Sequence, residues 1–269
     1  MPSQSNGDPD MSEFVLAKVE IEETAATIAA DRKFLASAVE AIRSTRSQIE
    51  RHIRQDRFFL TTLEPYDPEP SSERVIRRMC AASAAAGVGP MATIAGVIAQ
   101  EALEAMVSKG CRHGWVDNGG DIALILDKPA TLEIFSDLES RNACALELEP
   151  TDEIIGVCTS SGTLGHSVSF GNADVALAIA DDAVLADALA TAIGNTVTDK
   201  ESLSTCFDSF KSIDGFRAGL AMIEGSSSMY GKVPRIVEVE HNPERLTTHG
   251  KMSSARFIGT SSLETEVRT

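Results

Sequence analysis

Apolar residues recur along the first quarter of the chain with two different spacings. Residues 14–29 alternate loosely between apolar and polar side chains, which predicts one or two strands. Residues 31–57 carry apolar side chains every three or four positions, with arginine and glutamate between them, and this spacing predicts a long amphipathic helix. The sequence EPYDPEP at 64–70 is rich in proline and predicts a loop that ends this unit.

Two alanine-rich helices are predicted next. The sequence SSE at 71–73 is typical of a helix start, and Gly87 is typical of a helix end. A second helix is predicted over 91–109, with Pro90 near its first turn, where a missing N–H costs nothing. The glycine-rich turn at 87–91 leads into this helix and is a candidate anion site, but it lacks the lysine and hydroxyl residue of a P-loop.

After Gly110 the pattern changes to short apolar stretches separated by turn residues. Asn118-Gly119 is a strong hairpin signal between two of these stretches. Strands are expected at 115–116, 122–126, 132–135, 145–148, 154–158, 168–170, 175–179, 220–223 and 235–239, and helices at 182–193, ending at 194–195, and at 202–211. Helices that come first and short strands that follow indicate an α+β fold, with mostly antiparallel sheets packed with helices.

Charge and cysteine usage narrow the class of protein. A net charge of −16 over 269 residues repels phosphate backbones, so we expect no nucleic-acid partner. The five cysteines form no CxxC pair, which is typical of reduced thiols in a cytoplasmic protein and argues against a zinc site. No basic segment followed by an apolar stretch opens the chain, and its apolar runs are interrupted, so we expect neither a signal peptide nor a membrane span.

Polarity divides the chain into three parts. Residues 1–13 are polar, contain Gly and Pro, and are predicted to form a disordered N-terminus. Residues 14–240 hold the predicted elements and are expected to form a single domain, which is long enough to bury a core. Residues 241–269 are polar, and we expect a mobile tail.

The helix predicted at 182–193 has the most informative pattern. Its large apolar residues fall on one broad arc, whereas Asp187 and Thr191 lie one turn apart on the opposite side, among small residues. Such a face indicates that something approaches closely, and a divalent cation that prefers oxygen would suit a carboxylate and a hydroxyl. An alanine-rich packed helix in which a nearby amide or arginine holds Asp187 would give the same pattern.

Two glycine-containing loops are further candidates. The sequence TSSGTLGH at 159–166 offers hydroxyls and glycines that can cradle a phosphate, and its histidine, His166, can act as an acid, a base or a ligand. The sequence DNGGD at 117–121 lets a ligand approach the backbone, and its aspartates can accept hydrogen bonds from a ribityl or ribose hydroxyl. Ordinary turns between strands also explain both segments.

Four blocks of this sequence, taken in order, closely resemble an uncharacterised family within the ApbE-like superfamily. They are GVGPMATIAG, DNGGDIAL, CTSSGTLGHSVSFG and ADALATAIGN, and the resemblance covers about residues 23–239. A more distant resemblance links the chain to enzymes that transfer FMN from FAD onto a Thr or Ser of a protein. It rests on NGGD at 118–121, TSSG at 159–162 and DALAT at 187–191, beside the NxGG-type turn, the TSG loop and the AD-x-x-[ST] stretch of those enzymes.

The resemblance implies an ApbE-like fold, a flavin nucleotide as the small-molecule partner, and a role for each motif. It implies that Asp187 and Thr191 bind Mg²⁺, which would bridge pyrophosphate oxygens. Contacts with FAD or FMN are implied near Asn118, Gly119, Gly120, Ser160, Ser161 and Gly162. In the same loops, the carboxylate of Asp121 and the hydroxyls of Thr159 and Thr163 are further candidate contacts.

One departure from the transferases keeps more than one function open. Those enzymes carry an HxxDPxTG-type segment after the TSG loop, and its histidine is their proposed base. This sequence runs from Gly162 to Gly171 without such a segment and leaves His166 as the candidate catalytic residue. The hypotheses are therefore Mg²⁺-dependent transfer of FMN from FAD to a protein, a flavin- or nucleotide-binding module or redox-enzyme partner without transferase activity, and a structural protein that keeps the fold alone.

Overall fold

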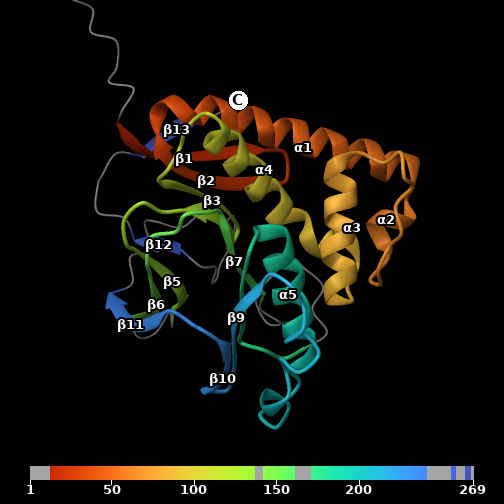
Figure 1. The fold of residues 1–269 in the computed structure, drawn as a ribbon, viewed down its shortest axis with the longest axis vertical. Helices are drawn as coiled ribbons and strands as arrows, with labels where there is room; N and C mark the ends of the chain where they lie inside the picture. Colours follow the sequence, from red (N-terminus) through yellow and green to blue (C-terminus); the bar gives the residue numbers. More distant parts are fainter. Residues whose placement is uncertain (1–12, 137–141, 161–170, 241–255, 259–263, 268–269) are drawn as a thin grey trace, which may run out of the picture.

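A nine-stranded sheet forms the centre of the molecule and has an apolar core on each side (Figure 1). The computed structural model describes residues 13–136, 142–160, 171–240, 256–258 and 264–267. Neighbouring strands of this sheet run antiparallel, except β1 and β13, which are parallel. In spatial order the strands are β10 (Ser226–Gly231), β9 (Phe216–Ile223), β8 (Val175–Ala180), β7 (Ile155–Ser160), β4 (Asp121–Ile125), β3 (Gly114–Asn118), β2 (Thr24–Asp31), β1 (Phe14–Ile21) and β13 (Glu264–Val267).

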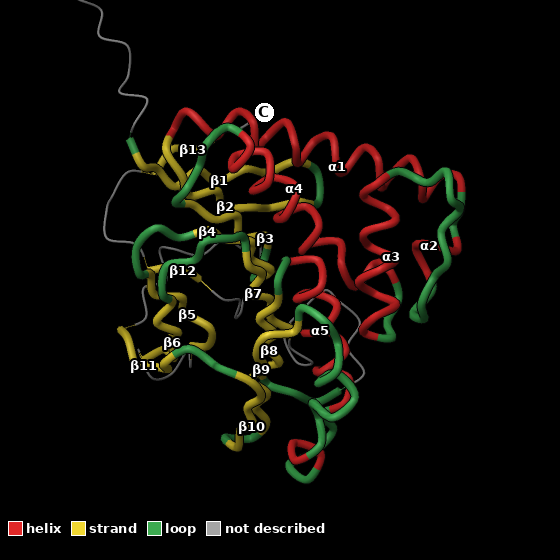
Figure 2. The backbone as a smooth tube through the Cα atoms, in the orientation of Figure 1, coloured by secondary structure: helices red, strands yellow, loops and turns green. Residues whose placement is uncertain are grey.

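Helices cover one face of this sheet and make the larger core with it (Figure 2). They are α1 (Leu35–Gln55), α2 (Phe58–Thr61), α3 (Arg74–Ala86), α4 (Ile94–Ser108) and α5 (Ala183–Thr196), with the 3₁₀ turns η1 (Arg32–Phe34), η2 (Pro90–Thr93) and η3 (Ser202–Ser204). The other face packs on a smaller antiparallel sheet, whose order is β11 (Arg235–Glu240), β6 (Asn142–Leu148), β5 (Ala130–Ser136) and β12 (Arg256–Ile258). The predicted α+β class with mostly antiparallel sheets is therefore confirmed.

Three local predictions differ from the structure. The hairpin between β3 and β4 turns at Gly119 and Gly120, whose φ angles are 75° and 102°, and not at Asn118-Gly119. Helix α5 continues through Gly194 to Thr196, because packing of the buried Gly194 against β7 and β8 outweighs its low helix propensity. The helix expected over 202–211 is one 3₁₀ turn at its start. There the N–H and the hydroxyl of Ser202 both donate hydrogen bonds to Asp199, and this local turn competes with a longer helix.

Residues 90–108 form the most apolar helical segment. Within the described parts of the chain, this is the one stretch long and apolar enough to cross a membrane by length and composition. Half of the most apolar part of this segment is buried inside the molecule, and α4 packs against α1, α5, β3 and β4. Core helices of soluble proteins have the same apolar composition, so this burial accounts for the hydropathy of the segment.

Helix α5 lies unusually close to α4 and β7. A Cβ atom added at Gly96 of α4 would overlap the Ala183 carbonyl oxygen and lie 2.8 Å from the Asp187 Cβ. A Cβ atom added at Gly156 of β7 would overlap the Ala183 Cα. Two glycines therefore let the backbone at Ala183 fit between a helix and a strand. The side of α5 that carries Asp187 among small residues thus packs closely against other parts of the protein.

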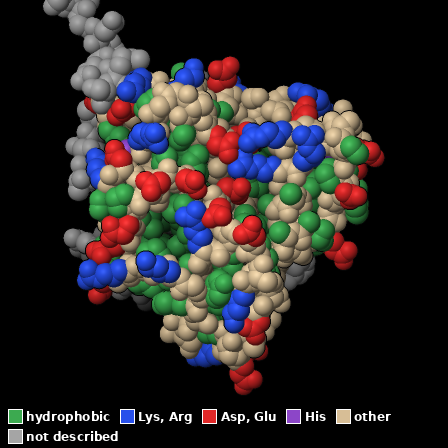
Figure 3. Space-filling model, in the orientation of Figure 1, with side chains coloured by type: hydrophobic (Ala, Val, Ile, Leu, Met, Phe, Trp, Pro, Cys, Tyr) green, Lys and Arg blue, Asp and Glu red, His purple; other side chains and the backbone are tan. Residues whose placement is uncertain are grey.

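Polar side chains fix the start of α5 in this position. Asp182 accepts a hydrogen bond from the Leu185 N–H at 2.8 Å, and Gln100 of α4 accepts one from the Ala183 N–H at 2.9 Å. Arg78 of α3 pairs with Asp182 at 3.2 Å and with Glu104 of α4 at 2.7 Å, so one guanidinium joins three helices. Charged groups of both signs are interspersed over this side of the molecule (Figure 3).

We expect Gly156→Ala to destabilise the protein strongly, because the backbone at Ala183 has no room to retreat. Overpacking of this kind costs about 1–3 kcal/mol or more, measured as the free energy of unfolding in urea. Gly194→Ala is the matched control, since its Cβ would meet its nearest neighbours at 3.5–3.7 Å. The control should be neutral or stabilise by up to about 1 kcal/mol, and equal losses in both variants would contradict the packing described.

Candidate functional site

The β3–β4 hairpin places the DNGGD motif against the start of α4. Asp117 Oδ1 accepts a hydrogen bond from the Gly120 N–H at 2.8 Å and so closes the turn. Asn118 Nδ2 donates to the Ala95 carbonyl oxygen at 3.2 Å, which ties the hairpin to the first turn of α4. A Cβ atom at Gly119 would meet nothing within 4 Å, so there is open space beside this turn.

Strand alternation divides the candidate residues between the two faces of the sheet. Asp121 is paired with Cys158, and both side chains face the helices, as does Ser160 two residues further along β7. Thr159 lies between Cys158 and Ser160 and therefore faces the other way, where its hydroxyl donates to the Gly120 carbonyl oxygen at 3.3 Å. Thr159 supports the hairpin, while Asp121 and Ser160 face the helix layer.

Asp187 reaches from α5 to the first turn of α4. Its Oδ2 accepts a hydrogen bond from the Gly96 N–H at 2.8 Å, and the Ala95 N–H contributes as well. The alternative in which a nearby amide holds Asp187 is therefore correct for this oxygen. The chain's own carboxylate occupies the helix N-terminus that the turn at 87–91 suggested as an anion site.

Asp187 and Asp121 are buried carboxyl groups whose negative charge the surrounding protein stabilises poorly. Burial raises the pKa of Asp187 to about 7, although the N–H groups of Gly96 and Ala95 favour its charged form. Burial and the nearby charges of Asp187 and Asp117 raise the pKa of Asp121 well above its usual range. Part of Asp121 is exposed, but its Oδ1 atom is buried and has no hydrogen-bond partner. Among the described residues, no positively charged side chain contributes to either of these shifts in pKa.

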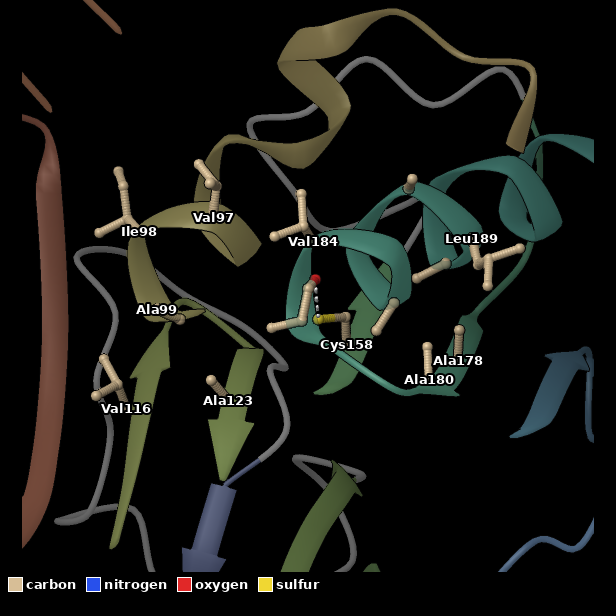
Figure 4. Close-up of a cluster of buried hydrophobic side chains, with 14 of the residues drawn as sticks. Val97, Ile98, Ala99, Val116, Ala123, Cys158, Ala178, Ala180, Val184 and Leu189 are labelled. Carbon is tan, nitrogen blue, oxygen red and sulfur yellow. Dashed lines mark hydrogen bonds between the residues drawn. The ribbon is translucent and has the colours of Figure 1, made fainter. Parts of the chain in front are cut away.

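The buried thiol of Cys158 lies beneath this pair of carboxylates and adds no charge to it. Its Sγ donates to the Ala183 carbonyl oxygen at 3.4 Å (Figure 4). Burial, with the charges of Asp121 and Asp187, raises the pKa of the thiol well above its usual range. All five cysteines are free, and the neutral Cys158 packs as a small apolar residue. Its fixed position beside Asp121 is not visible in the sequence, because the two residues lie far apart along the chain.

The donor set fits a hard cation held by a few protein oxygens. The described residues contain no group of three or more His, Cys, Asp or Glu side chains placed to hold a metal ion. Asp121 and Asp187 supply two carboxylates, one with an unpartnered buried oxygen, and half-buried Thr191 lies one turn along α5 from Asp187. Backbone carbonyls, water or a phosphate would complete the coordination sphere of a cation such as Mg²⁺, which usually binds only one or two protein carboxylates and retains several waters.

The described residues on either side of the hydroxyl-rich loop, Ser160 and Gly171, both lie beside α5. Ser160 Oγ would lie 3.6 Å from a Cβ atom at Gly194 of α5, and Gly171 packs on the Gly194 carbonyl group. The structure thus brings together Asn118, Gly119, Gly120, Asp121, Ser160 and Asp187. Four other predicted site residues, Ser161, Gly162, Thr163 and His166, lie outside the described residues, and their roles stay predictions.

Several solved structures share this fold. The flavin transferase ApbE from Vibrio cholerae, in a variant form, matches with a TM-score of 0.52 and 11% identity, over 81% of this chain and 97% of that one. The ApbE protein from Thermotoga maritima matches with a TM-score of 0.52 and 13% identity, over 80% and 96% of the two chains. At these identities the likeness establishes an ApbE-like fold, as the sequence blocks predicted.

Sequence relatives define the family more narrowly. The UPF0280 protein of Methanocella arvoryzae is 45% identical over 86% of this chain and 94% of its own length, and that of Methanosarcina acetivorans is 41% identical over 91% and 98%. The family model described as AbpE bacteria matches residues 11–206. The chain belongs to this ApbE-like family, and the resemblance inferred from its four blocks is confirmed.

We expect Asp121→Asn to stabilise the metal-free protein. Because the pKa of Asp121 is raised in the folded state, its ionised form lowers stability at pH 7, and a neutral amide of the same shape removes that cost. Tm in EDTA should rise by a few degrees, since about 1 kcal/mol moves Tm by about 2–4 °C for a domain of this size. The exposed carboxylate variant Asp152→Asn is the control and should leave Tm unchanged. A lower Tm for Asp121→Asn would contradict this account of the charges.

Proposed function

We propose that this protein binds a flavin nucleotide through a divalent cation held by Asp121, Asp187 and Thr191, and transfers FMN from FAD to a hydroxyl group of a protein. The observation that carries the proposal is the pair of desolvated carboxylates, with the unpartnered Oδ1 of Asp121, beside a glycine hairpin that is open at Gly119. The fold is that of proteins described as flavin transferases, which supports this use of the site.

The cation would neutralise charge on the pyrophosphate oxygens and stabilise the leaving phosphate. The protein's part is to hold the two carboxylates apart from solvent at fixed positions, Asp187 by the α4 N-terminus and Asp121 by its place in β4. Fixed ligands need no reorganisation when charge develops at the phosphates, and this is the main contribution that a scaffold can make to phosphoryl-type transfer.

The hairpin and β7 are the proposed nucleotide contacts. The open side of Gly119 leaves room for a ligand against the backbone, and the Asn118 and Thr159 side chains hold the hairpin in place from α4 and β7. Ser160 begins the hydroxyl-rich loop and faces the helices, which supports the proposal that its hydroxyl donates to a phosphate oxygen. Thr159 is thus proposed as a supporting residue and Ser160 as a contact.

In the proposed reaction, the hydroxyl oxygen of an acceptor Ser or Thr attacks the phosphorus of the FMN half of FAD. The bond from that phosphorus to the bridging oxygen breaks, AMP leaves, and the hydroxyl proton passes to a base. His166 is the residue that we propose for this proton, since the sequence has no HxxDPxTG-type segment. The missing segment favours one second candidate function, which is binding of the flavin nucleotide without transfer.

We expect FAD to bind the full-length protein in a manner that depends on Mg²⁺. Titration followed by flavin fluorescence should give saturable binding that EDTA abolishes, and Asp187→Asn should weaken it by at least roughly tenfold, because a metal ligand is lost. Asp152→Asn, which changes an exposed carboxylate, should bind as the wild type does. Tight binding in EDTA, or equal binding by both variants, would exclude a role for the cation.

Transfer is tested separately from binding. The protein is incubated with FAD, Mg²⁺ and purified candidate acceptor flavoproteins, and we expect an acceptor mass gain of one FMN with release of one AMP. Both products should disappear in His166→Ala, while FAD binding persists. Metal-dependent FAD binding with no adduct and no AMP release would favour the second function, and absence of FAD binding would reject both.

A further inference from the structure

Most of the large apolar side chains that reach the surface gather in one short segment. Among the described residues, four such side chains are strongly exposed, and three of them lie in or just after α2: Phe58 at 61%, Leu60 at 42% and Leu63 at 55%. The fourth, Met229, lies on β10, in another part of the molecule (Figure 1). Clustered apolar side chains mark an interaction surface, whereas single scattered ones are ordinary. We call Phe58, Leu60 and Leu63 the α2 patch.

Hydrogen bonds and buried rings hold the α2 patch in place. Asp56 accepts a hydrogen bond from the Phe58 N–H at 2.8 Å and one from the Tyr66 hydroxyl at 2.7 Å. One carboxylate thus joins the start of α2 to the loop that follows it. The fully buried Phe59 lies edge-on to the rings of His52 and Tyr66. The patch therefore belongs to a folded segment, and its exposure does not result from fraying.

The α2 patch and the candidate cation site both adjoin the 3₁₀ turn η2, because α2 and α5 each pack against it. A Cβ atom added at Gly89, just before η2, would overlap the Thr62 carbonyl oxygen and lie 2.9 Å from the Leu63 Cα. The path from Gly89 to Gly96, whose N–H binds Asp187, is one 3₁₀ turn and the first turn of α4, about 12 Å long. The patch thus lies within a short distance of the carboxylates.

Unpaired carboxylates border the α2 patch. Glu64, Asp67 and Glu69 follow Leu63 in the proline-rich loop, and all three are exposed. The neighbouring arginines of α1 do not neutralise them, because Arg51 pairs with Glu73 and Arg54 with Glu50. Residues 57–70 carry three acidic side chains and one arginine. An acidic border favours a partner with lysine or arginine beside its apolar residues. It disfavours an anionic membrane surface and a second copy of this chain, whose net charge is −16.

We propose that the α2 patch docks the acceptor protein of the flavin transfer, through an apolar segment of the acceptor that basic residues flank. This inference rests on the proposed function, in which a protein must bring a Ser or Thr hydroxyl to the cation site. About four extended residues span about 13 Å, so an acceptor held at the patch can reach the site along η2. Contacts remote from the reacting atoms then supply the binding energy that positions the hydroxyl.

Random peptides of about twelve residues, displayed on phage, are the probe for this surface. Selection on the full-length protein should enrich peptides that combine aromatic or aliphatic residues with lysine or arginine. Phe58→Asp should weaken the binding of synthetic copies at least tenfold, measured by fluorescence anisotropy, because an apolar contact is lost. The variant adds a negative charge, so weaker binding of a basic peptide cannot result from electrostatic repulsion.

Met229→Asp is the matched control, because it makes the same change of charge at another exposed apolar side chain, 53% exposed on β10. It should bind the peptides as the wild type does. Leu60→Asp repeats the test at the second exposed position of α2, and urea midpoints show which variants fold. Equal binding by the α2 variants and the control would overturn the inference.

A triple amide variant, Glu64→Gln with Asp67→Asn and Glu69→Gln, tests the charge of the border. It should weaken peptide binding at least tenfold at low salt, and the difference should shrink as salt screens the charges. The control replaces three exposed carboxylates between β6 and β7 in the same way: Glu149, Asp152 and Glu153. The control should bind as the wild type does, and equal effects of the two triple variants would reject charge complementarity.

Further outcomes separate the docking surface from the flavin site. Asp187→Asn should lose FAD binding and keep peptide binding, whereas intact FAD binding with no enriched peptide would reject the docking surface alone. In the transfer assay, Phe58→Asp should raise the KM for the acceptor and leave kcat unchanged, and an unchanged KM would overturn the inference. Self-association of the wild type that Phe58→Asp abolishes would assign the patch to a second copy and overturn it as well.

Discussion

The close approach of α5 to α4 and β7 determines the rest of the candidate site. Gly96 and Gly156 let the backbone at Ala183 fit between a helix and a strand, and this brings Asp187 to the N-terminus of α4. A wider spacing would leave that N-terminus without its carboxylate and would separate Asp187 from Asp121. The network of Arg78 and Gln100 holds the start of α5 in the same place.

The same arrangement leaves the site under electrostatic strain. Burial raises the pKa of Asp187 and of Asp121, and none of the described residues that influence these two carboxyls carries a positive charge. Proteins keep such unfavourable groups where function requires them, and a bound cation would convert the strain into affinity. Replacing Asp121 is therefore expected to raise stability and to weaken cation binding. Replacing Gly96 or Gly156 is expected to lower stability and to disturb the position of Asp187 as well.

Sequence reasoning predicted the elements and motifs better than the contacts between them. The spacing over 31–57 predicted α1, and the small residues around Asp187 and Thr191 indicated a close approach. The approaching groups are the backbones of α4 and β7, which no periodicity in α5 can identify. Likewise, the exposure of β10 was missed because SSSMYG lacks the apolar alternation that marks a strand.

In the proposed site, Asp121 and Asp187 share one divalent cation. Electron paramagnetic resonance of Mn²⁺, used in place of Mg²⁺ with the metal-stripped full-length protein and FAD, counts the ions that are bound. We expect one tightly bound Mn²⁺ per chain, and none when both residues are replaced by asparagine in a variant that still folds. Wild-type occupancy in that double variant would show that the two carboxylates do not bind the cation.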